Sequence, residues 1–220
     1  MTLTSLFAKE FRAGVPSSHG RSPALIFLHG RGADENDLPG LRDHLDLRFH
    51  CFSVRAPFPF EFGGYTWYEL LGIGNPEPKE FQQSYELLSN YIDSIRSRND
   101  IDASAIYLFG FSMGSMMALA YALRHPDRVR GVVAHSGHIP EMNGIVYRWN
   151  DLASISIFVA HGSLDPVVPV ALGRRARELL TKSNADFVYK EYPISHTIAE
   201  ESLADISGWL TEKLNSSAAL

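Results

Sequence analysis

The residues best suited to chemistry lie at positions 110–114, which read GFSMG and fit the pattern G-x-S-x-G. An apolar run of strand type precedes Ser112, and a run of small and apolar residues of helix type follows it. The pattern therefore predicts a sharp strand–turn–helix elbow with the serine at its apex, where a β-carbon at Gly110 or Gly114 would collide across the turn. Such an elbow presents the serine hydroxyl as a nucleophile. It also turns the Met113 N–H and the positive end of the helix dipole toward any oxyanion that forms there.

A serine nucleophile needs a base, and the base needs a carboxylate that holds its tautomer. Asp165 follows a predicted strand and His196 follows the last one, so both are expected at the carboxyl edge of a parallel sheet, beside Ser112. The chain order Ser, Asp, His is the order used by serine hydrolases built on such sheets. Asp127 and Asp186 are the alternative acids, but their places in the chain are typical of solvated surface carboxylates.

Further histidines fall at predicted strand ends on the same edge. His29, His135 and His161 could form a metal cluster, but they lack helical ligand spacing with a partner. Packing or backbone hydrogen bonding is the alternative interpretation, and we expect neither a metal nor a cofactor. His138 is expected to line the substrate pocket.

Residues 29–32, which read HGRG, follow the first parallel strand and are expected to supply a second oxyanion donor. The best candidate is the backbone N–H of Arg31, which would act together with that of Met113. The Arg31 side chain leaves two interpretations open. Pointing inward, it would bind a polar or anionic substrate group; pointing outward, it would contact only solvent.

The elements that must position these residues alternate along the chain. Continuous apolar runs predict buried strands, and repeats at three and four residues predict amphipathic helices. This alternation indicates an α/β fold with a mostly parallel, doubly wound sheet, helices on both faces and little or no cap, in a single domain over residues 1–220. Strands are predicted at 23–30, 49–55, within 105–111, and at 129–136, 155–162 and 187–192; helices are predicted at 37–47, 78–98, from 113 to 125, at 169–181 and after 196.

Two segments are less regular. Residues 6–12 favour a strand in an edge hairpin, and residues 56–78, which are rich in proline, glycine and aromatic residues, predict no regular element. The aromatic group includes Trp67 and Tyr68. These side chains are expected either to form an apolar wall of the substrate site or to pack the long segment onto the body of the protein.

Composition excludes several classes of function. The formal net charge is -5 and no basic block is present, so neither nucleic acid nor membrane insertion is expected. The single cysteine, Cys51, cannot form an internal disulfide. The N-terminus lacks a secretory signal pattern. These features predict a cytoplasmic protein. A small-molecule ester is the expected substrate, and both a monomer and a homodimer stay open.

Taken together, the motifs resemble the phospholipase/carboxylesterase family of α/β-hydrolases, which includes acyl-protein thioesterases. The resemblance covers residues 24–209 and is carried by LHGRGAD at 28–34, the 56–67 loop, GFSMG at 110–114, HGSLDPVVP at 161–169, and His196. It implies a triad of Ser112, Asp165 and His196 and an oxyanion hole formed by the backbones of Arg31 and Met113. The chain departs from the family at three positions: family members often have leucine in place of Arg31, glutamine in place of Met113 and glycine in place of Ser195. The resemblance therefore implies a lipidated-protein substrate less strongly.

The leading functional hypothesis is a serine carboxylesterase that cleaves short- to medium-chain acyl esters through an acyl-enzyme. An acyl thioesterase or lysophospholipase would use the same triad. A noncatalytic binding module on the same fold is a third hypothesis, but such proteins commonly lose a triad member, and none is missing here.

Overall fold

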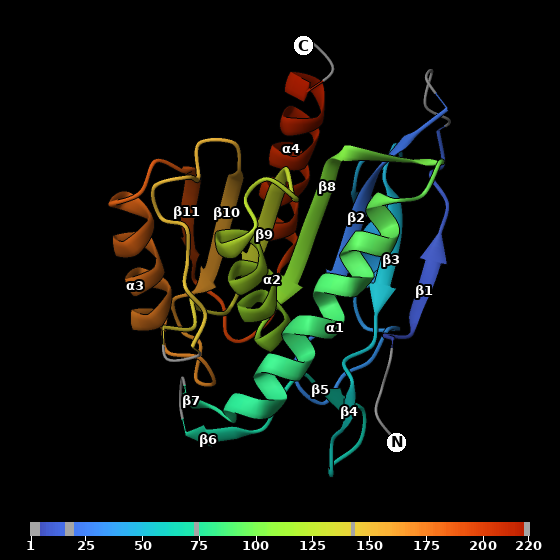
Figure 1. Ribbon diagram of the computed structural model, residues 1–220. Coiled ribbons are helices and arrows are strands. Elements are labelled where there is room, and N and C mark those ends of the chain that lie inside the picture. The colour runs from blue at the N-terminus through green and yellow to red at the C-terminus, as the bar shows by residue number, and fades with distance from the viewer. Residues whose placement is uncertain (1–4, 16–19, 73–74, 142–143, 218–220) are drawn as a thin grey trace.

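The computed structural model describes residues 5–15, 20–72, 75–141 and 144–217, and a seven-stranded sheet forms its centre (Figure 1). The strands pair in parallel, except that the edge strand β1 pairs antiparallel with β3. The sheet is therefore the mostly parallel, doubly wound sheet that the sequence predicts. Its order is β1 (Ala8–Phe11), β3 (His50–Val54), β2 (Ser22–Leu28), β8 (Ile101–Phe111), β9 (Gly131–His135), β10 (Ser156–Gly162) and β11 (Asp186–Tyr192).

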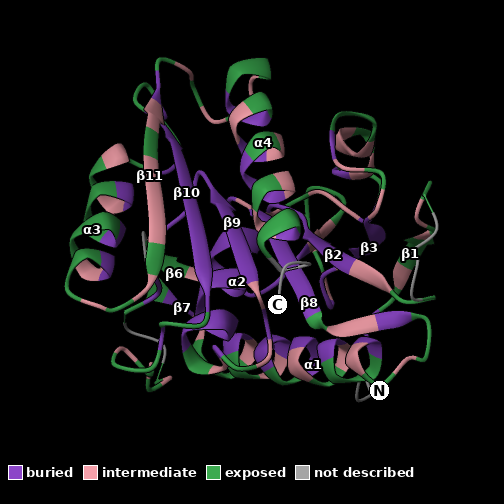
Figure 2. Cartoon of the chain, turned by 90° about the horizontal axis from the view of Figure 1, so that it is seen from above, coloured by how far each residue is buried: buried purple, intermediate pink, exposed green. Residues whose placement is uncertain are grey.

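Helices cover both faces of the sheet. α1 (Pro78–Arg96), α2 (Met113–Arg124) and α3 (Val170–Thr181) lie on one face, and α4 (Glu200–Ser217) lies on the other (Figures 1 and 2). The helix α2 packs against β8 and β9, and every one of its residues except Arg124 is buried. Its position is therefore fixed on all sides, and so is the turn that leads into it.

Side chains along each central strand alternate between two hydrophobic clusters. On β2, Ile26 and Leu28 belong to the cluster under α1 and α2. Their neighbours Leu25 and Phe27 belong to the cluster under α4. Because both faces of these strands are covered, the strands read as continuous apolar runs rather than alternating ones.

The prediction of a helix over residues 37–47 is wrong. The structure has a short 3₁₀ helix there, η1 (Pro39–His44), and Leu45 already has an extended backbone. The Asp46 carboxylate accepts a following backbone N–H at 3.0 Å, a local bond that favours a turn over further helix. Leu38 and Leu45 are nevertheless buried. The apolar spacing that predicted a helix thus reflects real packing in a shorter element.

The two irregular segments also differ from expectation. The described residues of the 56–78 segment contain four short strands, which pair as two antiparallel ribbons: β4 (Phe58–Pro59) with β5 (Tyr65–Thr66), and β6 (Leu70–Gly72) with β7 (Asn75–Pro76). Near the N-terminus, β1 does not form an edge hairpin with the next strand. It pairs with β3, with Ala8 opposite Val54.

Candidate active site

The turn between β8 and α2 has the geometry of a nucleophile elbow. Ser112 has φ 53° and ψ -120°, a strained conformation for a residue with a side chain. A β-carbon added at Gly110 would lie 2.4 Å from the Ser115 Cα, and one added at Gly114 would lie 2.0 Å from the Leu28 carbonyl oxygen. No side chain fits at either position. The two glycines therefore allow the close packing that holds Ser112 in its strained conformation.

The structure brings the three predicted side chains together. His196 Nε2 lies 2.9 Å from Ser112 Oγ, and His196 Nδ1 lies 2.7 Å from Asp165 Oδ2. Ser112 follows β8, Asp165 follows β10 and His196 follows β11, so all three come from the carboxyl ends of parallel strands. Residues that lie far apart in the chain thus form one line of hydrogen bonds.

The Asp165 carboxylate is held in place from its other side. Its Oδ1 accepts the backbone N–H groups of Val167 and Val168, each at 2.8 Å. Burial raises the pKa of Asp165, but hydrogen bonds from His196 and these two N–H groups outweigh that effect and hold the pKa below its usual value. The carboxylate therefore stays ionised and oriented toward His196.

His161 supports the same loop, a role that the sequence did not indicate. It is fully buried, and its Nε2 donates to the Val168 carbonyl oxygen at 2.9 Å. The same nitrogen lies 3.7 Å from Asp165 Oδ2. His161 thus fixes the segment whose backbone binds the carboxylate.

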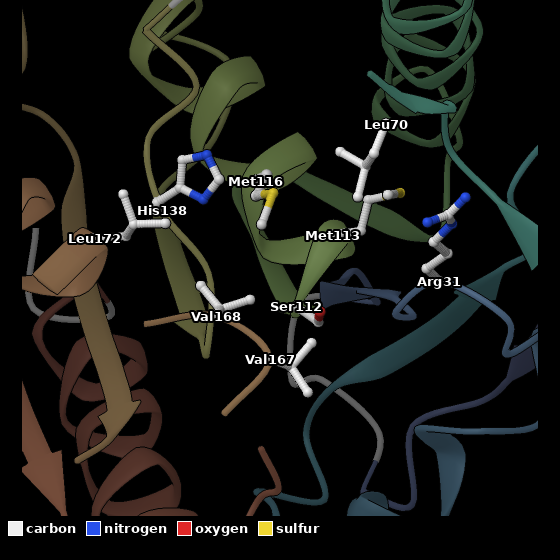
Figure 3. Close-up of a pocket in the computed structure, with 9 residues that line it drawn as sticks. All are labelled: Arg31, Leu70, Ser112, Met113, Met116, His138, Val167, Val168 and Leu172. Atoms are coloured by element: carbon white, nitrogen blue, oxygen red, sulfur yellow. The ribbon is translucent and has the colours of Figure 1, made fainter. Parts of the chain in front are cut away.

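A cavity of about 160 Å³ opens beside Ser112. Figure 3 shows Arg31 and His138 on opposite sides of it, with Met113 and Met116 between them. Apart from these end groups and the serine, its walls are apolar. The lining residues are Arg31, Leu70, Ser112, Met113, Met116, His138, Val167, Val168 and Leu172.

The two expected oxyanion donors flank Ser112. Met113 is the first residue of α2, and the loop that carries Arg31 passes so close that a β-carbon on Gly30 would lie 3.3 Å from the Ser112 Cβ. Within the described part of the chain, neither the Arg31 nor the Met113 backbone N–H has a hydrogen-bond acceptor. Both donors are therefore available to a ligand at the serine.

The Arg31 side chain lies at the rim of the cavity, between the two orientations that the sequence left open. Its guanidinium forms an ion pair with the Glu69 carboxylate and lies 4.5 Å from the centre of the Phe60 ring. Glu69 has no sequence signal that could have identified it, because it is an exposed acid in an irregular segment. The pair ties the 56–78 segment to the loop that carries the oxyanion donor.

Trp67 and Tyr68 do not line the cavity. Both are buried in the main core, where Trp67 Nε1 donates to the His29 carbonyl oxygen at 2.9 Å. The Tyr68 hydroxyl contacts the Met116 sulfur at 3.2 Å, behind the cavity wall. Of the two interpretations of this aromatic segment, packing onto the body fits these two residues. Of the other predicted substrate contacts, Arg31 and His138 lie at the cavity.

The histidines at the strand ends bind protein groups. His29 Nε2 accepts the Ala56 N–H at 3.0 Å, and its Nδ1 lies 2.6 Å from the Gly30 carbonyl oxygen. The His135 ring nitrogens lie 2.9 and 3.1 Å from the hydroxyls of Ser136 and Ser202. His29 thus makes the backbone hydrogen bonds that the sequence suggested for it, whereas His135 bonds to side-chain hydroxyls.

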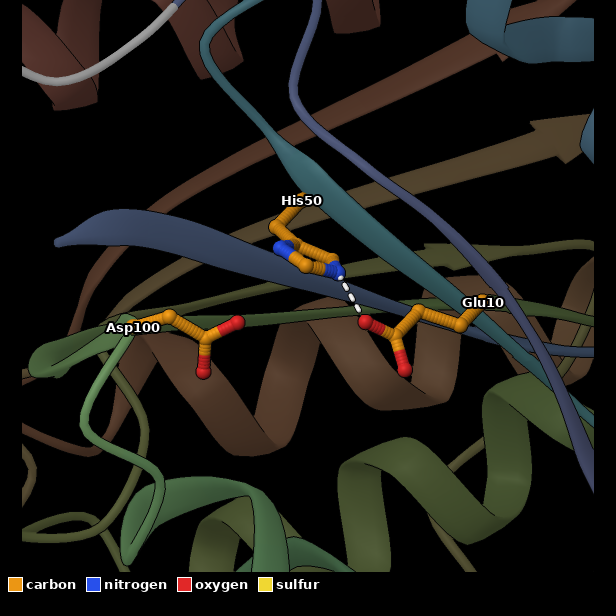
Figure 4. Close-up of side chains that lie close together, drawn as sticks. All are labelled: Glu10, His50 and Asp100. Carbon is orange, nitrogen blue, oxygen red and sulfur yellow. Dashed lines mark hydrogen bonds and ion pairs between the residues drawn. The ribbon is translucent and has the colours of Figure 1, made fainter.

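A different group of possible metal ligands lies at the far edge of the sheet. Among the described residues, only Glu10, His50 and Asp100 place three such atoms within 4.8 Å of one another (Figure 4). However, the Arg98 guanidinium donates to both carboxylates, at 2.7–2.9 Å. The Arg98 bond lowers the pKa of Glu10 to about 2. The carboxylates that could bind a metal ion are thus already paired with Arg98 in an ion-pair network.

The fold and the Ser–His–Asp arrangement define a serine hydrolase of the α/β-hydrolase class. Residues 13–214 match the family model described as Phospholipase/Carboxylesterase, and the chain belongs to that family, as its motifs indicate. It is 31% identical over 211 residues to acyl-protein thioesterase 1 of Debaryomyces hansenii, covering 87% of this chain and 91% of that protein. It is 28% identical over 217 residues to acyl-protein thioesterase 1 of Saccharomyces cerevisiae, covering 87% and 93%.

Solved structures share the fold. The Bacillus cereus carboxylesterase superposes with a TM-score of 0.83 at 24% identity, covering 96% of this chain and 95% of that one. The Mesorhizobium loti carboxylesterase gives 0.82 at 22% identity, covering 96% and 98%. Within the described residues, no helix is long and apolar enough to cross a membrane.

Proposed function

We propose that the protein hydrolyses uncharged carboxylic esters with short- to medium-chain acyl groups through an acyl-enzyme on Ser112. The observation that carries this proposal is the hydrogen-bonded line from Asp165 through His196 to Ser112, which ends at a small apolar cavity. An engineered cavity of roughly 150 Å³ holds benzene. A cavity of about 160 Å³ therefore suits a chain of about this bulk rather than a long fatty acyl group.

In the first half-reaction, His196 Nε2 takes the proton of Ser112 as Oγ attacks the carbonyl carbon of the ester. The tetrahedral intermediate collapses, the C–O bond to the alcohol breaks, and His196 gives its proton to the departing alkoxide. Water then attacks the acyl-enzyme with His196 again as base, which releases the acid and restores Ser112. Asp165 stays ionised throughout and stabilises the imidazolium.

The backbone N–H groups of Arg31 and Met113 would bind the oxyanion of each tetrahedral intermediate. Because both are held by packed elements, they need no reorganisation as charge develops, and loss of one such donor costs about 10²–10³ in rate. The dipole of α2 adds to their field, since its N-terminus faces the same point.

A thioester substrate is the second candidate, favoured by the relatives named acyl-protein thioesterase 1. The same serine and oxyanion donors would cleave it. A panel of p-nitrophenyl esters, acyl-CoA thioesters and lysophospholipid, compared by kcat/KM, separates these substrates.

The direct test of the proposed function is Ser112→Ala. Because the triad acts as a unit, we expect ester hydrolysis to fall by about 10⁶, with an unchanged thermal unfolding curve. Ser136→Ala is the matched control: Ser136 also has positive φ (55°) after a strand, but its hydroxyl contacts His135. An organophosphonate should label Ser112. A folded Ser112→Ala protein with near-normal turnover, or a label on another serine, would show that Ser112 is not the nucleophile.

A further inference from the structure

His138 lies at the end of the cavity opposite Arg31 and is 8% exposed. Its Nδ1 is buried and has no hydrogen-bond partner among the described residues. The ring nitrogens of His29 and His135 are all hydrogen-bonded. His161 Nδ1 is also buried without a partner among the described residues, but His161 is not one of the residues that line the cavity. In Figure 3 the ring edge that carries both nitrogens of His138 is turned toward Met116 and Val168, across the cavity.

The surroundings of this imidazole make it neutral. Burial lowers the pKa of His138 to about 4, and nearby His161 lowers it further in the same direction. A neutral imidazole has one nitrogen that donates and one that accepts. Arg31, the charged residue among those that line the cavity, lies at the opposite end (Figure 3). The Glu141 carboxylate acts on His138 in the direction that raises its pKa, but it is paired with Arg175 and does not outweigh burial.

An imidazole nitrogen that is removed from water without a partner destabilises a folded protein, and such groups are rare. The described side chains that line this end of the cavity, Met116, Val168 and Leu172, are apolar and offer no hydrogen bond in exchange. A plain hydrocarbon chain in the cavity would leave the nitrogen equally unpaired. A polar atom of a ligand that fills this end would supply the missing partner.

We propose that His138 recognises an uncharged oxygen, a keto or hydroxyl group, carried on the acyl chain some bonds away from the scissile carbonyl. The preferred substrates are then oxygenated acyl esters rather than plain ones. A carboxylate does not suit this end, because a buried anion would need a cation or several donors, and the neutral ring supplies one donor at most. This inference rests on the proposed ester hydrolysis.

The test compares p-nitrophenyl hexanoate with its 4-oxo and 5-oxo derivatives, each kcat/KM being divided by the rate of alkaline hydrolysis. We expect the wild-type protein to favour one oxo ester by roughly 3- to 10-fold, the value of one uncharged hydrogen bond. His138→Phe keeps the ring and removes the nitrogens, so it should lose that preference. His138→Gln restores a donor and should recover part of it.

His44→Phe is the control, because His44 is exposed on η1 outside the cavity. It should retain both activity and preference. His138→Phe should unfold at the same temperature as the wild-type protein or higher, since it removes an unpaired polar atom. If His138→Phe does not fold, His138→Gln alone tests whether the oxo preference depends on His138. Equal oxo-to-plain ratios in the wild-type and His138 variants would overturn the inference and leave water as the partner of the ring.

A binding arm separates this inference from the proposed function. Calorimetry of Ser112→Ala with 5-oxohexanamide, 4-oxohexanamide and hexanamide, with and without His138→Phe, needs no turnover. If no ester is hydrolysed, the proposed function fails, while His138-dependent binding of an oxo amide still supports the inference. If esters are hydrolysed but the keto group changes neither binding nor rate, the inference alone fails. A preference that follows a keto group on the alcohol side instead would also refute it.

Discussion

Replacing Asp165 by asparagine exchanges one carboxylate oxygen for an NH₂ group. The structure indicates which way the new amide would face. Oδ1 accepts two backbone N–H groups, from Val167 and Val168, at 2.8 Å each. The amide oxygen must stay there, because an NH₂ group would place donor against donor. The NH₂ group therefore takes the place of Oδ2 and faces His196 Nδ1.

This orientation reverses the tautomer of the base. His196 Nδ1 would accept the amide N–H, so its proton would move to Nε2, which lies 2.9 Å from Ser112 Oγ. An Nε2 that carries a proton cannot take another from the serine. In a serine protease with the same three groups, the equivalent change lowers kcat by about 10⁴ without disturbing the geometry. We expect a loss of this size here, about 5.5 kcal/mol of transition-state stabilisation.

The assay is kcat with p-nitrophenyl butyrate, together with thermal unfolding to show that the variant is folded. Asp127→Asn is the control: Asp127 is an exposed acid that pairs with Arg148 and should tolerate the change. Asp165→Ala should be less stable than Asp165→Asn, because it leaves both backbone N–H groups without their acceptor. A folded Asp165→Asn protein within tenfold of wild-type activity would refute the tautomer argument.

Two other ion pairs give predictions of opposite kinds. Arg31→Leu should change kcat/KM on a neutral ester and on a matched ester with a carboxylate near the scissile bond by the same factor, within about threefold. The reason is that Glu69 already pairs with the guanidinium. A loss confined to the charged ester would show that Arg31 binds substrate. Glu35→Gln should lower stability at pH 7 by about 2 kcal/mol, since buried Glu35 accepts two bonds from Arg55 at 2.6 Å. These bonds lower the pKa of Glu35 from 4.5 to about 2, so their contribution is complete above pH 4.5 and is lost as pH falls toward 2. The difference in melting temperature between the two proteins should shrink over that range, and a constant difference would contradict the assignment.

The sequence predicted that Ser112, Asp165 and His196 would lie together because topology, more than side-chain packing, determines their positions. Parallel strands end at one edge, so Ser112, Asp165 and His196 had to meet once the strands before them were recognised. The glycines of the elbow were equally predictable, since the turn leaves no space for a side chain. Each of these inferences depends on backbone geometry that local sequence determines.

The cavity could not be predicted in the same way. Its walls come from elements far apart in the chain, with Leu70 on β6, Met116 on α2 and Leu172 on α3. In residues 56–78 no period indicates which aromatic side chains turn inward, so composition alone could not place Trp67 and Tyr68 in the core. The wrong prediction of a longer helix at η1 has a local cause. The apolar spacing there resembles that of a longer helix, but a proline, a glycine and the local bonds of Asp46 outweigh it.

The polar groups at the two ends of the cavity also bear on which substrate class fits. Among the described residues, Arg31 is the one cation that lines it, and its charge is offset by Glu69, whereas burial keeps His138 neutral. An anionic group at the rim would have to compete with Glu69 for the guanidinium, and one at the far end would be desolvated beside an uncharged ring. A lysophospholipid carries a phosphodiester anion close to its ester, whereas a simple acyl ester carries none. The electrostatics of the cavity therefore support the proposal of uncharged esters rather than lysophospholipids, although both would react by the same steps at Ser112.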